Sequence, residues 1–255
     1  MRIIISRTDG IGDVILTLPM LGLLKTHIPK VEIVFLNRKY TSPVLECCEH
    51  IDRLVSWDDC EKKSIPDQVA FLKSLEADVI IHVFPRPEIA RAAKMAGIAM
   101  RIGTTGRLYH IHTCNYLVRF SRKRSSLHEA QLNLKLLKPL KIKHRLKLRA
   151  IADFYGLHAP TAISDETKKW LQPDRKNVVL HPLSKGSAVE WGLDNFKRLI
   201  QLLPPDEFRI FLTGTEAEGQ LFRDPLPIDE PSVIDISGKL DLRELVGFIA
   251  SCSAV

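Results

Sequence analysis

Cysteine is scarce in this 255-residue chain, and its placement excludes two classes of small protein. The cysteines are odd in number and scattered, no C-x-x-C pair occurs, and no His/Cys group has the spacing of a zinc site. The sequence therefore predicts neither a disulfide framework nor a structural metal. The five cysteines are Cys47, Cys48, Cys60, Cys114 and Cys252.

Long apolar runs are also lacking. No stretch approaches the roughly 18–20 consecutive apolar residues that cross a membrane. The amino terminus has no signal-peptide core either, so we expect a cytoplasmic protein. With 45% hydrophobic and 26% charged residues, the composition is that of a globular protein with a core. It excludes disordered, collagen-like and coiled-coil chains.

Acidic residues are nearly absent from one segment. Residues 101–150 contain 13 Lys and Arg but a single acid, Glu129, whereas the other 205 residues contain 24 basic and 29 acidic side chains. Such a concentration indicates an anionic partner, and a solvated face without a partner is the alternative. Few aromatic residues interleave with the charges, and no nucleic-acid-binding motif accompanies them. We therefore predict a small anion or a lipid headgroup as partner, and no nucleic acid.

The first half of the chain alternates short apolar runs with helical stretches. Residues 3–6 lead into a glycine-containing turn, after which apolar residues recur at helical spacing. Pro19 should break that helix or confine it to short pieces. Further buried strands are expected at 32–36 and 78–83, each after a helical stretch. This alternation predicts a parallel sheet in an α/β domain.

The second half shows a similar series of elements. Strands are expected at 178–180, 209–212 and 233–236, with helices between them. A last helix begins at Asp241 and has Glu244 three residues later, an aspartate variant of the capping box. The two series together indicate two α/β domains rather than one.

We place the domains at residues 1–160 and 161–255. In paired domains of this kind, ligands bind at the carboxyl ends of the strands, in the cleft between the domains. Ala254 and Val255 resemble the opening of a fourth strand in the second domain. That domain is therefore predicted to be incomplete.

The first candidate site is Gly10-Ile11-Gly12-Asp13, directly after the first strand. Glycines let the backbone approach a ligand, and the amides of a helix N-terminus attract anions. Ile15 stands where a dinucleotide-binding motif has its third glycine, which disfavours that class of site. Asp13 at the helix start would be kept ionised by the helix dipole, so it is a candidate general base. Simple capping of the helix is the alternative.

Two further candidates lie in the second half. In the loop after its first strand, Ser184, Lys185 and Ser187 offer hydroxyl, ammonium and amide groups to a pyrophosphate. An ordinary polar loop is the alternative, because the loop lacks the P-loop pattern. After the next strand, Glu216 and Glu218 place carboxylates where ribose hydroxyls are bound in dinucleotide sites. Acids also favour the first turn of a helix, so this signal alone is weak.

These residues together resemble a known family. The run R-T-D-G-I-G-D-V-I-L-T-L-P at 7–19 resembles the opening motif of glycosyltransferase family 9, the ADP-heptose:lipopolysaccharide heptosyltransferases. The resemblance covers essentially the whole chain, and this motif is its most specific part. Other matching segments follow in the family's order: Arg101-Ile102-Gly103, H-E-A-Q-L-N-L from His128, His181-Pro182, W-G-L-D-N-F at 191–196 and S-G-K-L-D-L-R-E-L at 237–245.

The resemblance implies a GT-B architecture, in which two Rossmann-like domains with parallel sheets face a cleft. The amino-terminal domain would bind the acceptor and the carboxy-terminal domain the nucleotide-sugar. Asp13 matches the family's proposed general base, which would deprotonate an acceptor hydroxyl. That hydroxyl would attack the anomeric carbon of ADP-heptose, with inversion and release of ADP. The absence of a D-x-D motif fits transfer without a metal ion, and no cofactor is implied beyond the ADP-sugar donor.

The resemblance also divides the candidate residues between two substrates. An anionic lipopolysaccharide-core acceptor would contact Gly10, Gly12, Arg101, Arg122, Arg124 and His128. The ADP-sugar donor would contact Ser184, Lys185, Ser187 and Glu218, with Glu216 less favoured. The implied protein is a cytoplasmic monomer whose basic surface could contact the cytoplasmic face of the inner membrane.

Two departures from the family pattern leave an alternative open. The family commonly carries a lysine two positions before Trp191, where this chain has Val189, and Lys185 is the candidate replacement. The family's D-[ST]-G-P-x-H signature would follow the strand that opens at Ala254, so we expect the chain to be a fragment of a longer enzyme. The alternative is a catalytically inactive relative that binds sugar phosphates or lipid headgroups through its basic face.

Overall fold

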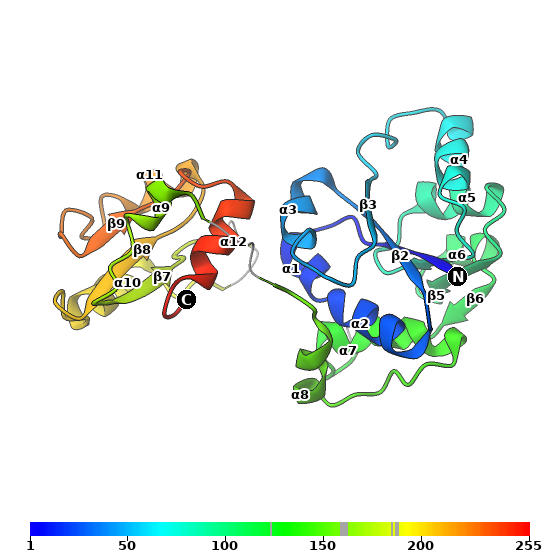
Figure 1. Cartoon of the computed structure of the whole chain (residues 1–255). Coiled ribbons are helices and arrows are strands. Elements are labelled where there is room, and N and C mark those ends of the chain that lie inside the picture. Colours follow the sequence, from blue (N-terminus) through cyan, green and yellow to red (C-terminus); the bar gives the residue numbers. More distant parts are fainter. Residues whose placement is uncertain (123, 159–162, 185, 187–188) are drawn as a thin grey trace. The chain divides into compact units, whose positions relative to one another are not determined.

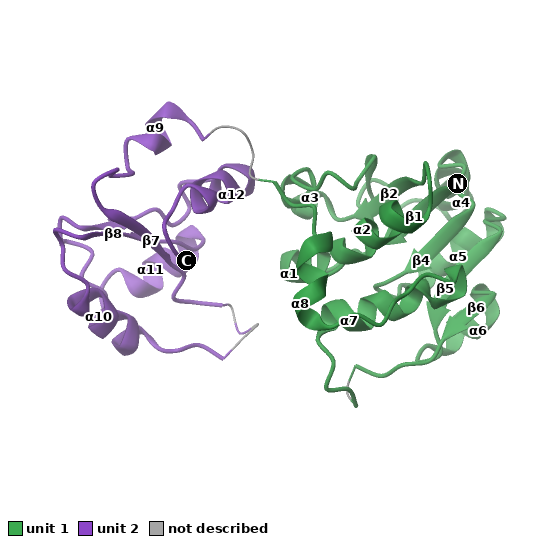
Figure 2. Ribbon diagram, turned by 60° about the horizontal axis from the view of Figure 1, so that its bottom comes forward, with its two compact units in different colours: residues 1–158 green, residues 159–255 purple. Residues whose placement is uncertain are grey.

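The structure is a computed structural model, and it describes residues 1–122, 124–158, 163–184, 186 and 189–255. The chain forms two compact units, Met1–His158 and Ala159–Val255 (Figure 2). The boundary expected after residue 160 lies outside the described residues. No helix of the described ranges combines the length and the apolar character needed to cross a membrane.

Unit 1 is built on a six-stranded sheet in the order β3-β2-β1-β4-β5-β6 (Figure 1). All neighbouring strands are parallel. Because β1 lies inside the sheet and the chain winds outward from it in both directions, this is the doubly wound order of a Rossmann-like domain. The strands are β1 (Arg2–Ser6), β2 (Glu32–Asn37), β3 (Arg53–Ser56), β4 (Val79–His82), β5 (Met100–Thr104) and β6 (Tyr116–Val118).

Helices connect these strands, and short 3₁₀ turns extend three of them. The α-helices are α1 (Ile11–Ile15), α2 (Leu18–His27), α3 (Ser42–Leu45), α4 (Ile65–Ser74), α5 (Pro87–Met95), α6 (Leu108–Thr113), α7 (Glu129–Leu134) and α8 (Leu148–Ile151). The 3₁₀ turns are η1 (Lys39–Thr41), η2 (Lys135–Leu140) and η3 (Ala152–Phe154). Pro19 is the second residue of α2, which confirms the expected break after α1.

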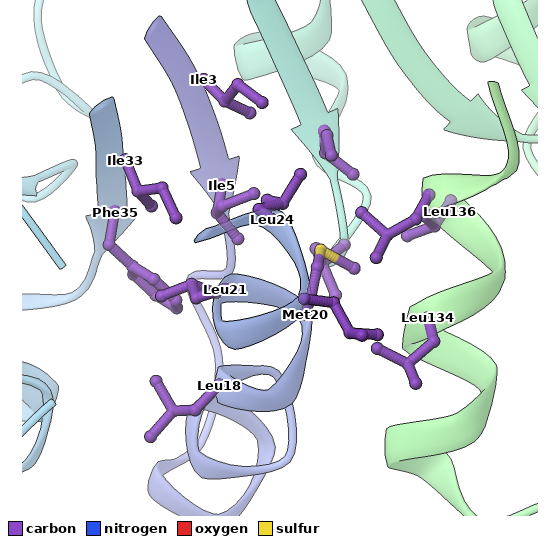
Figure 3. Close-up of a cluster of buried hydrophobic side chains, with 14 of the residues drawn as sticks. Ile3, Ile5, Leu18, Met20, Leu21, Leu24, Ile33, Phe35, Leu134 and Leu136 are labelled. Atoms are coloured by element: carbon purple, nitrogen blue, oxygen red, sulfur yellow. The ribbon is translucent and has the colours of Figure 1, made fainter. Parts of the chain in front are cut away.

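Each face of the first sheet packs on its own hydrophobic cluster. The side chains of Ile3 and Ile5 of β1 lie on the side of the sheet that α2 and α7 cover. Met20 of α2 and Leu134 of α7 belong to the same cluster (Figure 3). Ile4 points to the opposite side, among residues of α4 and α5. Burial on both faces explains why β1 is a continuous apolar run rather than an alternating one.

Unit 2 contains a three-stranded parallel sheet in the order β7-β8-β9. Hydrophobic clusters lie on both of its faces, and Phe211 packs edge-on against Phe248 with ring centroids 4.8 Å apart. The strands are β7 (Lys176–Leu180), β8 (Phe208–Leu212) and β9 (Val233–Asp235). The helices are α9 (Asp165–Lys168), α10 (Leu193–Leu202), α11 (Glu216–Phe222) and α12 (Leu242–Ala250).

The residues expected to open a fourth strand lie beside β7. Ala254 forms a parallel bridge with Val178, and the Val179 amide donates to the Ala254 carbonyl at 2.9 Å. This edge of β7 is the one opposite β8, so Ala254 occupies the position that β4 takes beside β1 in unit 1. The strand prediction at Ala254 is therefore confirmed in its placement.

The predicted cap of the last helix is half correct. Asp241 accepts a hydrogen bond from the Glu244 amide at 2.8 Å, as a helix N-cap should. The Glu244 carboxylate does not return to the cap. It accepts hydrogen bonds from the hydroxyls of Ser164 (2.5 Å) and Thr167 (2.6 Å), which belong to the start of α9. A tertiary contact has thus replaced the local one.

Candidate active site

A buried arginine organises the carboxyl edge of the first sheet. The Arg7 amide donates to the Leu36 carbonyl at 3.0 Å and so extends the pairing of β1 with β2 by one residue. This contact fixes the Arg7 backbone, and its side chain is only 3% exposed. A guanidinium held in this way is pre-organised to bind carboxylates at the end of the sheet.

Three carboxylates surround the Arg7 guanidinium. Nε lies 2.7 Å from Asp9 Oδ1, Nη2 lies 2.5 Å from Asp13 Oδ1, and Nη1 lies 3.4 Å from Glu129 Oε1. Asp9 and Asp13 come from the turn after β1 and from α1, whereas Glu129 opens α7. We call Arg7 and these three acids the Asp13 cluster.

Asp13 is the most exposed acid of the cluster, with 45% of its side chain accessible. Its backbone carbonyl accepts a hydrogen bond from the Thr17 hydroxyl at 2.9 Å, which anchors the short helix α1. A carboxylate that is held by a buried cation on one side and open to solvent on the other can accept a proton from a bound hydroxyl. The geometry therefore suits the general-base role predicted for Asp13.

The α7 side of the cluster is held by a second arginine. Arg122 Nε contacts both Glu129 oxygens, at 2.9 and 3.1 Å, and Arg122 Nη2 lies 3.3 Å from Asn133 Oδ1. Asn133 in turn donates to the Leu16 carbonyl at 3.1 Å, in the turn between α1 and α2. These contacts tie α7 to the segment that carries Asp13, so the cluster is one connected unit.

Asp9 is the strongly perturbed group of the cluster. Burial raises the pKa of Asp9 to about 6, an effect that the Arg7 guanidinium opposes and the Asp13 charge reinforces. The Tyr40 hydroxyl donates to the Asp9 carbonyl at 2.8 Å, and burial raises the pKa of that phenol. Asp9 therefore titrates closer to neutral pH than an ordinary aspartate.

We expect the substitution Asp9→Asn to remove a pH dependence of stability. The folded-state pKa of about 6 lies above the unfolded value of about 3.9, so the folded protein binds this proton more tightly. The resulting stabilisation is complete below about pH 4 and is lost as pH rises through about 6. The free energy of unfolding of the wild type, relative to Asp9→Asn, should fall across this interval in urea titrations.

The matched control for that experiment is Asp59→Asn, which changes an exposed aspartate of unit 1 outside the cluster. Its stability difference from the wild type should not follow the Asp9 interval. Parallel curves for wild type and Asp9→Asn between pH 4 and pH 7 would contradict the raised pKa.

The structure brings some of the predicted acceptor residues to this cluster. Gly10 is the N-cap residue of α1, and a Cβ built on it would lie 3.5 Å from Asp13 Oδ2. A Cβ on Gly12 would meet nothing within 4 Å among the described residues. Arg122 is part of the network through Glu129, as described above. Gly10 therefore leaves space beside the Asp13 carboxylate, and Gly12 leaves space at the next position of α1.

Other predicted acceptor residues have different surroundings. Arg101 lies in register with Ile80 in the body of the sheet, and its guanidinium donates to the carbonyls of Ile98 and Thr113. The structure therefore does not bring Arg101 to the cluster. His128 is the N-cap residue of α7, where its ring accepts a hydrogen bond from an α7 amide. Arg124 is exposed.

The predicted donor loop is described only in part. Lys185 and Ser187 lie outside the described residues. Glu190 Oε1 accepts hydrogen bonds from the Ser184 amide at 2.8 Å and from its hydroxyl at 3.0 Å. His181 is at the start of the loop, and its Nδ1 lies 3.1 Å from the hydroxyl oxygen of Thr213, the residue after β8. Ser184 is thus at the carboxyl end of β7, where it was expected.

Glu218 takes part in a helix cap. Its Oε2 accepts hydrogen bonds from the Thr215 amide at 2.7 Å and the Thr215 hydroxyl at 2.8 Å, and the Glu218 amide donates back to Thr215. This is a complete capping box at the start of α11. Glu216 Oε1 lies 2.6 Å from Arg223 Nη1, and Arg223 Nε lies 2.7 Å from Asp235 Oδ2. Both acids therefore have intramolecular partners in unit 2, and their contact with the donor stays a prediction.

Sequence reasoning missed three members of the Asp13 cluster. Arg7 and Asp9 both lie in the R-T-D-G-I-G-D motif, but only its glycines and Asp13 were singled out. Glu129 was visible as the one acid among 13 basic residues of its segment, a pattern that favours an internal ion pair. The sequence alone could not show that Glu129 meets Arg7, because 121 residues separate them.

Solved structures with the same fold identify the architecture. A glycosyltransferase family 9 protein from Veillonella parvula superposes with a TM-score of 0.73 at 19% identity, covering 98% of this chain and 73% of that one. The chain has the family 9 glycosyltransferase fold. The ADP-heptose lps heptosyltransferase II of E. coli superposes with a TM-score of 0.72 at 16% identity. The match covers 99% of this chain and 77% of that one.

The heptosyltransferase WaaC of E. coli, solved with ADP-2-deoxy-2-fluoro heptose, also gives a TM-score of 0.72, at 18% identity over 99% of this chain and 81% of that one. In sequence, the chain is 25% identical over 228 residues to a Haemophilus influenzae protein named "Putative glycosyltransferase". That alignment covers 86% of this chain, which spans 65% of the length of the relative. No family model matches the chain.

These likenesses confirm the predicted fold class: an α/β chain of the GT-B type, with Rossmann-like units carrying parallel sheets. The family 9 fold also agrees with the position of the Asp13 cluster, because ligands of doubly wound sheets bind outside the carboxyl ends of the strands.

Proposed function

We propose that this chain is part of an inverting glycosyltransferase, which transfers a heptose or related sugar from an ADP-sugar to a lipopolysaccharide-core acceptor. The observation that carries the proposal is Asp13, a half-exposed carboxylate fixed by the buried Arg7 at the carboxyl edge of the sheet. The family 9 fold supports it, since solved proteins with this fold include heptosyltransferases. Because the chain spans 65% of its curated relative, the activity is inferred for the protein to which it belongs.

The chemistry requires one proton transfer and one displacement. The acceptor hydroxyl oxygen forms a bond to the anomeric carbon of the donor while the bond from that carbon to the diphosphate oxygen breaks. The hydroxyl proton passes to the Asp13 carboxylate, and ADP leaves with the bonding electron pair. Attack opposite to the leaving group inverts the anomeric configuration. Arg7 stays charged and holds Asp13 in place throughout.

Other residues are proposed to bind the two substrates. On the acceptor side, Gly10 leaves room beside Asp13 and Gly12 leaves room at the residue before it, and Arg122 and Arg124 supply positive charge for an anionic glycan. On the donor side, we retain the loop after β7 as the diphosphate site, with Ser184, Lys185 and Ser187 as its ligands. Transfer without a metal ion or cofactor, a monomeric state and a cytoplasmic location with inner-membrane contact belong to the same proposal.

The test is a transfer assay with the whole protein, ADP-heptose and a phosphorylated inner-core oligosaccharide. We expect one ADP to be released for each heptose transferred, an inverted anomeric centre by NMR, and no change on addition of EDTA. Retained configuration would contradict the mechanism. Binding of the sugars without transfer would favour the alternative, a catalytically inactive relative.

The substitution Gly12→Ala tests whether the acceptor occupies the open space at Gly12, the residue before Asp13. Alanine favours a helix over glycine by about 1 kcal/mol, and its Cβ meets none of the described residues, so stability should be kept or increased. Transfer should nevertheless fall at least about tenfold, because a bound sugar and the methyl group compete for one space. Unchanged transfer by this variant would place the acceptor elsewhere.

A further inference from the structure

A basic pocket lies in unit 1 where β6, η2 and the segment 142–146 meet. Its main cavity has a volume of about 420 Å³, and two adjoining cavities of about 300 and 400 Å³ share His144 and Arg145 with it. None of the lining residues is acidic. The cationic side chains that line these cavities are Arg119, Lys135, Lys138, Lys141, Lys143 and Arg145.

The charge of the pocket is not balanced by an ion pair among the described residues. Glu129 is the only acid between residues 101 and 150, and Arg7 and Arg122 already bind it. None of the six pocket cations takes part in an ion pair with any residue that the structure describes. Like charges gathered around one cavity repel one another, so a bound anion would lower the free energy of this arrangement.

The walls of the pocket are fixed without a ligand. Val118 of β6 and Ile142 are buried, and both belong to the hydrophobic cluster beneath the pocket. The side-chain amide of Gln131 donates to the Leu146 carbonyl at 2.9 Å and so holds the segment 142–146 against α7. A site built before binding loses little entropy when a ligand arrives.

The pocket also has an apolar side. Tyr116 and Leu117 of β6 are 45% and 39% exposed, and with Pro139 they line the main cavity. Its volume of about 420 Å³ lies in the range of small-molecule sites, about 300–1,000 Å³. A ligand that matches both parts carries a phosphate group and a ring with apolar C–H faces.

One aromatic ring joins the pocket to the Asp13 cluster. The Arg122 guanidinium lies 5.4 Å from the centroid of the Phe120 ring, and Lys135 Nζ lies 5.9 Å from it. Arg122 belongs to the network of Asp13, whereas Lys135 lines the pocket. Phe120 therefore connects a cation of the pocket with the Arg122–Glu129 ion pair that holds the Asp13 cluster.

We propose that the basic pocket binds a phosphate ester carried on a sugar. Arg119 and Arg145 can bind phosphate oxygens in bidentate fashion, the lysines add charge, and Tyr116 offers its ring to the sugar. That this phosphorylated sugar belongs to the acceptor rests on the proposed function, whereas the binding itself does not.

Calorimetric titration of the 255-residue chain at low ionic strength tests the site, with glucose 6-phosphate, glucose, inorganic phosphate and phosphatidylglycerol vesicles as probes. We expect saturable binding of glucose 6-phosphate, tighter than that of phosphate, and none of glucose. The double variant Arg119→Gln/Arg145→Gln should weaken binding at least tenfold. The matched control, Arg53→Gln/Arg91→Gln, removes the same charge at exposed sites of unit 1 and should bind like the wild type.

Four results would overturn the proposal: no saturable binding, equal weakening in both double variants, phosphate bound as tightly as glucose 6-phosphate, or binding only of phosphatidylglycerol vesicles. The last would assign the pocket to a lipid headgroup. The variant Asp13→Asn should still bind glucose 6-phosphate. Binding in the pocket without any sugar transfer would contradict the proposed function while supporting this site.

Discussion

Replacing Asp13 by asparagine should reduce sugar transfer by about 10²- to 10⁴-fold, the range over which a general base contributes to a rate. The amide keeps the size of the side chain and an oxygen that can accept the Arg7 hydrogen bond, but it cannot take the acceptor proton. Because almost half of the Asp13 side chain is exposed, we expect the free energy of unfolding to change by less than about 1 kcal/mol. Initial rates of ADP release and urea denaturation measure the two effects.

Asp59→Asn is the control, since it removes an exposed carboxylate of the same unit away from the cluster. It should leave both the rate and the stability unchanged. The binding of donor and acceptor should also survive in Asp13→Asn, because the base acts on the proton and not on either substrate as a whole. A loss of rate below about tenfold would remove Asp13 from the proposed role of general base.

Replacing Arg7 by methionine should destabilise unit 1 by about 3 kcal/mol. Removal of one partner from a buried ion pair costs about 3–5 kcal/mol, and the lower end applies because the carboxylates around Arg7 keep some contact with solvent. Methionine retains most of the apolar stem, so lost packing contributes little. Urea denaturation at pH 7 gives the free energy of unfolding directly.

The same variant carries a pH signature that a packing defect would lack. Arg7 opposes the rise in the pKa of Asp9, so without it that pKa should lie above its wild-type value. Burial of the ionised Asp9 carboxylate without Arg7 then destabilises the folded state most. The loss of unfolding free energy should therefore be larger at pH 8, where Asp9 tends to be ionised, than at pH 5. Arg91→Met, at an exposed position of α5, is the matched control. A loss that is equal at both pH values would place the effect in packing.

The fold class was predictable from local sequence patterns, whereas the strands β3, β5 and β6 of the first sheet were not predicted. Continuous apolar runs such as residues 3–5 mark strands buried on both faces, and helical stretches between them require parallel pairing. Pro19 predicted the division of the first helical stretch into α1 and α2, because a proline in the interior of an α-helix breaks or kinks it. The alternation of strands and helices in the second half also predicted a strand at Ala254, and Ala254 lies beside β7.

Two predicted site residues have partners in the structure that their sequence neighbourhood did not lead us to expect. Glu218 was expected at a ribose, but the Thr215 hydroxyl three residues earlier completes a capping box. The T-x-x-E spacing was a visible signal for that cap. Arg101 was grouped with the acceptor residues because of its charge, yet its guanidinium is used by backbone carbonyls near the strand that carries it. Charge in a sequence does not show what is already bound.

The sequence by itself determined the parallel α/β class, the alternation of strands and helices and the place of Asp13 after β1, because these depend on apolar periodicity and on the order of elements along the chain. Only the tertiary structure decided which charges meet. Glu129 reaches Arg7 because α7 packs beside α2 on one face of the sheet and begins near the end of β1, whereas the cations around Arg145 gather about a cavity without an acid. Ion pairing depends on distances of a few ångströms between remote segments, and no local pattern encodes those distances.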